Sequence, residues 1–191
     1  MSLRSMKRLV RSPYLWAMVA VVTVVGYAYT ARDRYRQAAI LPGARAPDFS
    51  FRSLEHGEVR LSDYEGHVVL INVWATWCEP CREEMPAMQR LYDALKGEDF
   101  EILAVSVDAV LGASDAFGQV GGDLSAFADR YDLTFPILYD PSGTMRQAYQ
   151  VSRVPESFIV AKDGVIRNKI AGATEWDHPV NQELIRRLLE G

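Results

Sequence analysis

Residues 70–82 read LINVWATWCEPCR, and this stretch decides the fold of the chain. Its first half continues a run of apolar residues, 68–73, of the kind that forms a strand buried on both faces. Its second half opens a predicted helix over residues 79–96, in which apolar side chains recur at helical spacing until Gly97. A second buried strand is predicted at 102–107. This strand–helix–strand order implies two parallel strands joined by a right-handed crossover.

The flanking sequence extends this unit into one domain, which we expect to cover residues 43–191. The further predicted elements are a hairpin from 49–51 and 59–61, a helix after Asp123, a strand at 135–139, a short helix at 144–149, a hairpin from 157–161 and 165–170, and a closing helix at 180–189. Together they predict an α/β domain with a central mixed β-sheet and helices on both faces.

Composition limits the classes of protein to which the chain can belong. It has 191 residues, of which 49% are apolar and 24% charged, so a disordered chain and a collagen-like fibre are excluded. Two cysteines are too few for a disulfide scaffold. The net charge of −4 gives no reason to expect a nucleic-acid partner.

The N-terminal segment differs in charge from the remainder of the chain. Residues 1–42 carry a net charge of +6, and the remainder carries −10. Within this segment, residues 12–31 are twenty uncharged residues, which as a helix span roughly 30 Å, the thickness of a bilayer's hydrocarbon core. We therefore expect a transmembrane anchor, or uncleaved signal, at 12–31. A basic cytoplasmic N-terminus at 1–11 would precede it, and a polar tether at 32–42 would follow it.

The orientation of this segment follows from its lysine and arginine bias. Four basic residues precede the uncharged run and three follow it, which favours the acidic domain outside the cytoplasm. A cleaved signal peptide is an alternative, because Gly26-Tyr27-Ala28 is a small-x-small triplet. A buried core helix is disfavoured, because no amphipathic stripe is present. We expect the domain in the periplasm or at the outer face of the cytoplasmic membrane.

Cys78 and Cys81 form a C-x-x-C motif at the predicted helix N-terminus. Unpaired N–H groups and the helix dipole at this position favour the Cys78 thiolate. Cys81 follows one turn later, close enough to attack a mixed disulfide formed at Cys78. Pro80 suits the first turn, where its missing N–H costs nothing. Glu79 disfavours the thiolate, which favours a reductant over a strong oxidant.

Other uses of the cysteine pair stay open at this stage. A zinc site would need two further ligands, and His56, His67 and His178 are not paired at ligand spacing. A Cu(I) carrier would use the two thiolates, and an inert structural disulfide would stabilise little across so short a ring. A peroxidase would need a Thr-x-x-Cys site, whereas Thr76 lies only two residues before the cysteine. We expect no bound metal and no cofactor.

Five stretches of the domain resemble one family. They are APDF at 46–49, LINVWATWCEPCR at 70–82, EMP at 84–86, FPIL at 135–138 and VPESFIV at 154–160. On these residues the chain resembles the TlpA/ResA/CcmG-type thiol-disulfide oxidoreductases, which are membrane-anchored, extracytoplasmic members of the thioredoxin superfamily. The resemblance implies a thioredoxin-like fold for the domain.

The resemblance also implies roles for individual residues. Cys78 would be the attacking nucleophile and Cys81 the resolving thiol. Pro155 matches the family's cis-proline, and Val154 before it would present its backbone edge to a substrate strand. Glu84 matches an acid that tunes the thiols in the ResA-like members.

Further residues complete the predicted site. Glu156 resembles an acid of the cytochrome-maturation members, and we expect Trp77 and Pro80 to contact substrate together with it. Asn72 stands where many cytoplasmic thioredoxins carry a buried Asp. Because an amide does not titrate, proton transfer is expected to use Glu84, Glu156 or water.

These observations predict a membrane-tethered protein-disulfide reductase. Its expected partners are disulfide-containing protein substrates, such as apocytochrome c or copper-site proteins, and a membrane thiol transporter that returns electrons. A net disulfide oxidant and a Cu(I)- or metal-binding assembly factor are the alternatives. The glycine-rich residues 109–122 form either a partner-recognition loop or a flexible connection.

Overall fold

The computed structural model describes residues 13–36, 40–115 and 118–191. The chain divides into two compact units, Met1–Ala39 and Ile40–Gly191. Within the described residues, the first unit holds one helix and the second holds all of the strands. The predicted cytoplasmic segment at 1–11 lies outside the described residues.

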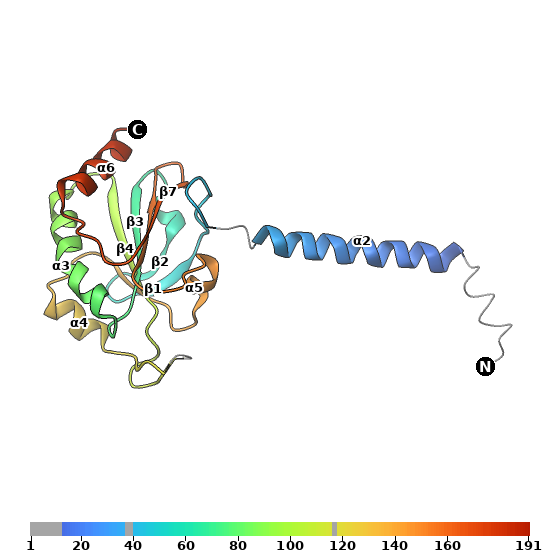
Figure 1. The fold of residues 1–191 in the computed structure, drawn as a ribbon, viewed down its shortest axis with the longest axis horizontal. Helices are drawn as coiled ribbons and strands as arrows, with labels where there is room; N and C mark the ends of the chain where they lie inside the picture. The colour runs from blue at the N-terminus through green and yellow to red at the C-terminus, as the bar shows by residue number, and fades with distance from the viewer. Residues whose placement is uncertain (1–12, 37–39, 116–117) are drawn as a thin grey trace. The chain divides into compact units, whose positions relative to one another are not determined.

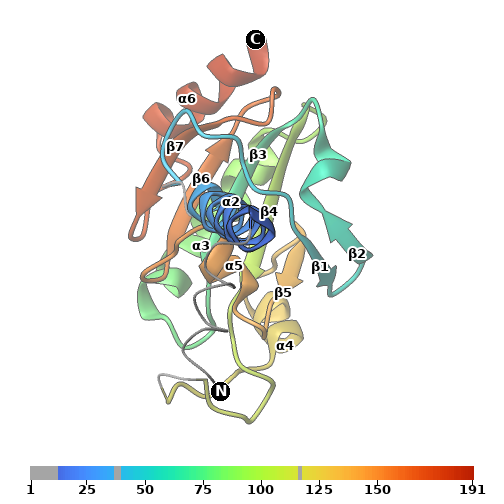
Figure 2. The same cartoon turned by 90° about the vertical axis from the view of Figure 1, so that its right-hand side faces the viewer.

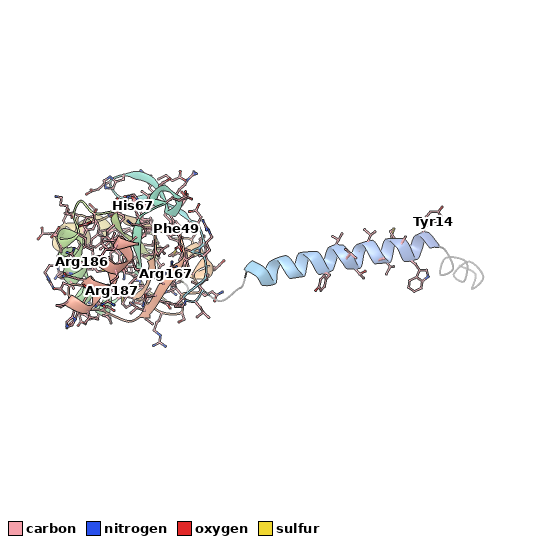
Figure 3. The ribbon with its side chains drawn as sticks, turned by 90° about the horizontal axis from the view of Figure 1, so that it is seen from above. Tyr14, Phe49, His67, Arg167, Arg186 and Arg187 are labelled. Atoms are coloured by element: carbon pink, nitrogen blue, oxygen red, sulfur yellow. A yellow bond between two sulfur atoms is a disulfide. The ribbon has the colours of Figure 1, made fainter. Side chains whose placement is uncertain are left out.

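The first unit contains α2 (Pro13–Arg36), a helix of 24 residues. Its described side chains are all exposed and project on every side of the helix, with Tyr14 near the first turn (Figure 3). Among the described residues, no helix is both long enough and apolar enough to cross a membrane. The transmembrane helix expected at 12–31 is therefore not supported. Part of the expected tether at 32–42 is helical, because α2 continues to Arg36.

The second unit is built on a seven-stranded sheet with the strand order β2-β1-β5-β4-β3-β6-β7. The strands are β1 (Ser50–Ser53), β2 (Gly57–Arg60), β3 (Val68–Trp74), β4 (Phe100–Ser106), β5 (Ile137–Tyr139), β6 (Glu156–Val160) and β7 (Ile166–Ala171). The β3–β4 and β4–β5 pairs are parallel, and the other neighbours are antiparallel. Figure 2 shows the order across the sheet, from β7 on the left to β2 on the right. The predicted mixed sheet and its two hairpins are confirmed.

Helices cover both faces of this sheet. They are η1 (Leu61–Tyr64), α3 (Glu79–Ala94), α4 (Leu124–Arg130), α5 (Thr144–Ala148) and α6 (Pro179–Glu190). In Figure 1, α3, α4 and α6 lie on one side of the sheet and α5 lies on the other. The crossovers β3–α3–β4 and β4–α4–β5 proceed in the same direction across the sheet, so their common right-handedness places α3 and α4 on the same face.

β3 is the centre of the core, because all seven of its residues are buried. It pairs with β4 on one side and β6 on the other, so that Asn72 lies opposite both Ala104 and Ser157. At its end, the Trp74 ring packs 4.6 Å from the ring of Phe127 in α4. The loop that carries the cysteines therefore starts from a strand fixed on both edges and on its helical face.

Candidate thiol-disulfide site

The cysteine motif lies where α3 begins. β3 ends at Trp74, and Cys78 is the N-cap residue of α3, with its N–H donating to the Ala75 carbonyl at 3.2 Å. The Cys81 N–H donates to the Cys78 Sγ at 3.2 Å. Pro80 lies in the first helical turn, as predicted. The Cys78 sulfur thus occupies a position where unpaired helix N–H groups favour negative charge.

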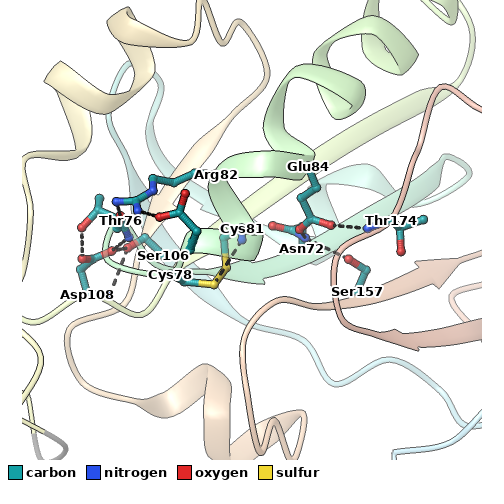
Figure 4. Close-up of a disulfide and its surroundings, with 11 residues drawn as sticks. Asn72, Thr76, Cys78, Cys81, Arg82, Glu84, Ser106, Asp108, Ser157 and Thr174 are labelled. Atoms are coloured by element: carbon teal, nitrogen blue, oxygen red, sulfur yellow. Dashed lines mark hydrogen bonds and ion pairs between the residues drawn. A yellow bond between two sulfur atoms is a disulfide. The ribbon is translucent and has the colours of Figure 1, made fainter.

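Cys78 and Cys81 are joined in a disulfide, with their Cα atoms 5.2 Å apart (Figure 4). Cys78 retains 5% of its surface exposed, whereas Cys81 retains none. An incoming sulfur atom can therefore approach Cys78 but not Cys81. This asymmetry favours the predicted assignment of Cys78 as the attacking thiol and Cys81 as the resolving thiol.

Glu84 is a buried acid in α3, one turn after Cys81 and only 3% exposed. Its carboxylate accepts hydrogen bonds from Asn72 Nδ2 at 2.8 Å and from the Thr174 N–H at 3.1 Å. Burial raises the pKa of Glu84 to about 7, although these hydrogen bonds act in the opposite direction. An open groove between α3 and residues 173–178 is lined in part by Glu84. Glu84 can therefore exchange a proton with solvent near neutral pH.

Asn72 connects Glu84 to the sheet. Its fully buried Nδ2 donates to Glu84 and to Ser157 Oγ, the latter at 2.9 Å. Its Oδ1 has no hydrogen-bond partner among the described residues. When Glu84 is protonated, a flip of the Asn72 amide turns its Oδ1 toward the acid as a hydrogen-bond acceptor. The Ser157 hydroxyl can donate or accept, so it can pair with the amide in either orientation. Asn72 thus suits a neighbour that titrates, without titrating itself.

The Val154–Pro155 peptide bond is cis, as predicted. The Pro155 carbonyl accepts a hydrogen bond from the Gly172 N–H at 2.9 Å. The next residue, Glu156, begins β6 and lies opposite Val73 of β3. The proline therefore lies at the same end of the sheet as the start of the cysteine loop.

Glu156 lies on the opposite face of the sheet from Glu84. Ser157 contacts Asn72 on the α3 face, and adjacent residues of a strand point to opposite faces. Glu156 is 4% exposed and pairs with Lys169 at 3.2 Å. The two acids proposed for proton transfer are thus separated by the sheet. Only Glu84 shares a face with Asn72.

Comparison with known proteins identifies the family. Residues 42–169 match the family described as AhpC/TSA. The chain belongs to this family. It is also similar to the thiol-disulfide oxidoreductase ResA of Geobacillus kaustophilus, with 35% identity over 173 residues that cover 91% of this chain and 90% of that protein. The thioredoxin-like protein YneN of Bacillus subtilis is 39% identical over 155 residues, covering 80% of this chain and 86% of that protein.

A solved structure of similar fold comes from Chlorobium tepidum and is described as a thiol:disulfide interchange protein DsbE. It shares 28% identity with a TM-score of 0.64, and the match covers 80% of this chain and 97% of that chain. These findings confirm the thioredoxin-like fold and the predicted enzyme class. This member of the AhpC/TSA family is a thiol-disulfide oxidoreductase.

The surroundings of Cys78 in this oxidoreductase differ from expectation in one respect. Glu79 forms an ion pair with Arg82, which also donates to the Thr76 carbonyl at 3.5 Å. The cation offsets the charge of Glu79, so the argument from Glu79 alone for a reductant is weakened. Trp77, beside the cysteine, is partly buried against the core.

Asp108 is a buried residue next to the site that the motif analysis missed. One carboxylate oxygen accepts from the Thr76 N–H at 2.9 Å and from Ser106 Oγ at 2.7 Å. The other accepts from Thr76 Oγ1 at 2.5 Å (Figure 4) and from the Gly122 N–H at 3.3 Å. One sequence signal was present, since Asp108 follows β4, and functional residues gather at the carboxyl ends of neighbouring parallel strands.

In the part of the chain that is described, no group of side chains could hold a metal ion. No three His, Cys, Asp or Glu side chains gather there as a metal ion would require. In the oxidised form, the two sulfur atoms are bonded to each other.

Proposed function

We propose that this oxidoreductase reduces disulfides of specific partner proteins outside the cytoplasm. The observation that carries the proposal is the unequal exposure of the two sulfur-bearing residues at the start of α3. Cys78 is 5% exposed at the N-cap and Cys81 is fully buried one turn later. Such a pair engages one substrate sulfur at a time and then resolves internally.

The first step is attack on the substrate. In the reduced chain, the Cys78 thiolate attacks one sulfur of the partner's disulfide, and the S–S bond of the partner breaks. A mixed disulfide then joins Cys78 to the partner, whose second sulfur leaves as a thiolate and takes up a proton.

The second step releases the product. Cys81 loses its proton and attacks the Cys78 sulfur, which breaks the mixed disulfide and frees the partner as a dithiol. The chain keeps the Cys78–Cys81 disulfide, the form seen in the structure. Two electrons and the proton of Cys81 have then passed from the chain to the partner, and the second proton of the dithiol comes from solvent, so the reaction balances.

Glu84 is our candidate for the proton step at Cys81. It lies three residues later on the same helix, and positions three apart share a helix face. With a pKa raised to about 7 by burial, it accepts a proton at neutral pH and passes it to the groove that it lines.

The location outside the cytoplasm rests on the sequence of the N-terminal segment. Residues 12–31 are uncharged and follow four basic residues, as in segments that direct a chain into or across the membrane. We propose that this segment holds the chain at the outer face of the membrane. A membrane thiol transporter would then return electrons to Cys78 and Cys81.

The candidate substrates are disulfides of apocytochrome c haem motifs or of copper-site proteins. Both have paired cysteines that must be reduced before they bind haem or metal. This choice of substrates follows from the resemblance of the sequence to the TlpA/ResA/CcmG-type proteins.

The direct test is to trap the first step in cells with Cys81→Ala. This variant attacks substrate but has no resolving thiol, so mixed disulfides with the natural partner should accumulate on non-reducing gels. Cys78→Ser is the matched control and should trap nothing. If no adduct forms and the wild-type chain is found fully oxidised in cells, the reductase proposal is wrong.

The reduction potential separates the reductase from the alternatives. We expect a value of roughly −200 to −270 mV, whereas a value near about −120 mV would favour a net oxidant. A metal-binding role would instead show one bound copper or zinc ion per chain, and a purely assembly role would leave the function intact in Cys78→Ser.

A further inference from the structure

The described residues between β4 and α4, 107–115 and 118–123, form an ordered loop and not a flexible connection. Two β-bridges cross it, Leu111 with Gly121 and Ser114 with Val120. The Gly121 N–H donates to the Ala113 carbonyl at 2.9 Å, and the Ala113 N–H donates to the Val110 carbonyl at 2.7 Å. Its backbone is therefore held by its own hydrogen bonds on both sides of residues 116–117, which are not described.

This ordered loop exposes a concentration of aliphatic side chains. Val110, Leu111 and Val120 are 60%, 64% and 56% exposed. In the described part of the second unit, only two other large apolar side chains are as open to solvent, namely Leu41 and Val180. Exposed apolar groups that gather on a rigid surface mark an interaction site more often than a random surface does. We call Val110, Leu111 and Val120 the apolar lip.

The apolar lip is fixed to the cysteine loop. Its return strand ends at Gly122, whose N–H donates to Asp108, the same carboxylate that binds the Thr76 N–H and hydroxyl. A Cβ atom on Gly122 would lie 2.3 Å from Thr76 Oγ1, so the two segments touch directly. Thr76 is two residues before Cys78. The segment that carries Val120 is therefore anchored to a residue only two positions before the reactive cysteine.

We propose that the apolar lip docks the protein substrate by covering aliphatic side chains that flank its disulfide. The inference rests on the proposed function, in which a partner's disulfide must reach Cys78. Because that residue is only 5% exposed, the partner has to lie flat on the surrounding surface to deliver its sulfur. The lip supplies the part of that surface where apolar contact is available, and it selects among substrates that all contain a disulfide.

Charge disfavours a lipid surface as the occupant of the lip. Residues 97–129 contain no lysine or arginine, and they include Asp108, Asp115, Asp123 and Asp129. An anionic membrane attracts basic segments and repels acidic ones. A protein segment with aliphatic side chains beside a cysteine meets no such repulsion.

The test uses two synthetic peptides and a small disulfide. Both peptides carry the same intramolecular disulfide, flanked by Val and Leu in one and by Ser in the other, and the small disulfide is DTNB. With the reduced full-length chain, we expect kcat/KM for the aliphatic peptide to exceed that for the serine peptide by roughly tenfold, as burial of one to two aliphatic side chains would give. In the double variant Leu111→Ser/Val120→Ser this preference should fall to about twofold or less, while the DTNB rate is unchanged.

Val180→Ser is the matched control, because it removes an aliphatic side chain of 68% exposure from α6. It should leave the peptide preference intact. The inference is overturned if the wild-type chain shows no preference, or if the double variant keeps it. It is also overturned if the double variant binds phosphatidylglycerol vesicles more weakly than the wild-type chain, since the lip would then contact lipid. If the wild-type chain did not reduce DTNB, this result would instead count against the proposed function.

Discussion

At the residue scale, Glu84 is the acid of the candidate site whose pKa the fold raises. Its pKa is raised from 4.5 to about 7 by burial, so between these values the folded chain binds more protons than the unfolded chain. The contribution of Glu84 to stability is therefore fully present below about pH 4.5 and is lost as the pH rises to about 7. Ionised Glu84 is thus a cost to the fold at neutral pH, which agrees with the proton-transfer role that we propose for it.

Glu84→Gln should remove this pH dependence. Relative to the wild-type chain, the free energy of unfolding of the variant should rise by about 3 kcal/mol between pH 4.5 and pH 8, as a shift of this size implies. The constant cost of changing the hydrogen bond from the Thr174 N–H cancels in this difference. Chemical denaturation of both proteins across this pH range measures it. A difference that stays constant with pH would contradict the role of burial.

Asp108→Asn should loosen the start of the cysteine loop. The carboxylate accepts four hydrogen bonds, two from Thr76, one from Ser106 and one from Gly122. An amide presents an NH₂ group to some of these donors and leaves them unpaired in the interior. We expect a loss of about 2–4 kcal/mol in the free energy of unfolding, against about 1 kcal/mol for Thr76→Val, which removes a single bond. Equal losses in the free energy of unfolding of the two variants would show that the other hydrogen bonds of Asp108 do not hold the cysteine loop.

At the element scale, the loop between β4 and α4 depends on a close approach at Gly121. A Cβ atom there would lie 2.0 Å from the Ala109 carbonyl oxygen, a backbone atom that cannot turn away. Gly121→Ala should therefore open the loop, and the amides of Gly112 and Asp115, which donate to the Gly121 and Gln119 carbonyls, should exchange hydrogen much faster than in the wild-type chain.

Gly112→Ala is the comparison for this change. Gly112 has a φ of +76°, but nothing lies within 4 Å of its added Cβ, so the expected cost is only about 1 kcal/mol of backbone strain. Exchange in the loop should then stay close to that of the wild-type chain. Equal opening in both variants would mean that conformation, not contact with Ala109, holds the loop.

The elements differ in how far the sequence predicts them. β3 and α3 have long apolar patterns with clear ends, so both were predicted within a few residues of their bounds. For the loop at 109–122 the sequence allows both a partner-recognition loop and a flexible connection, because glycine content does not show which distant atoms a loop binds. Its order comes from Asp108, which contacts Thr76 across 32 positions of sequence. Contacts of this range leave no local pattern.

The same distinction applies within the site. The cysteine motif and the cis-proline carry local signatures, whereas the sheet face of an acid depends on strand register. The sequence leaves Glu84, Glu156 and water open as proton carriers. The pairing of Asn72 with Ser157 places the two acids on opposite faces. The ion pair of Glu79 with Arg82 likewise depends on the geometry of the helix, and we did not predict it from the sequence.

At the scale of the whole molecule, the second unit, residues 40–191, should fold without the N-terminal segment. Ile40 is buried at its start, and residues 40–47 add backbone bonds to the β6–β7 hairpin and its loop, such as Gly43 N–H to the Ile166 carbonyl at 2.8 Å. A chain of residues 40–191 should therefore keep the free energy of unfolding and the DTNB rate of the full chain within experimental error. In cells it should lose its function, because it lacks the segment that we propose holds it at the membrane.

A second truncation decides whether the unit truly begins at Ile40. A chain of residues 48–191 loses the burial of Ile40, the bond between the Ala46 N–H and Gly164, and the carbonyl of Pro47 that accepts from the Tyr149 hydroxyl at 2.6 Å. Since burial of one aliphatic side chain and several hydrogen bonds are lost together, it should be less stable by roughly 3–6 kcal/mol. If both truncated chains were as stable as the full chain, residues 40–47 would not belong to the folded unit. If the 40–191 chain were the one destabilised, the N-terminal segment would contribute to the fold itself, and its loss of function in cells would say nothing of location.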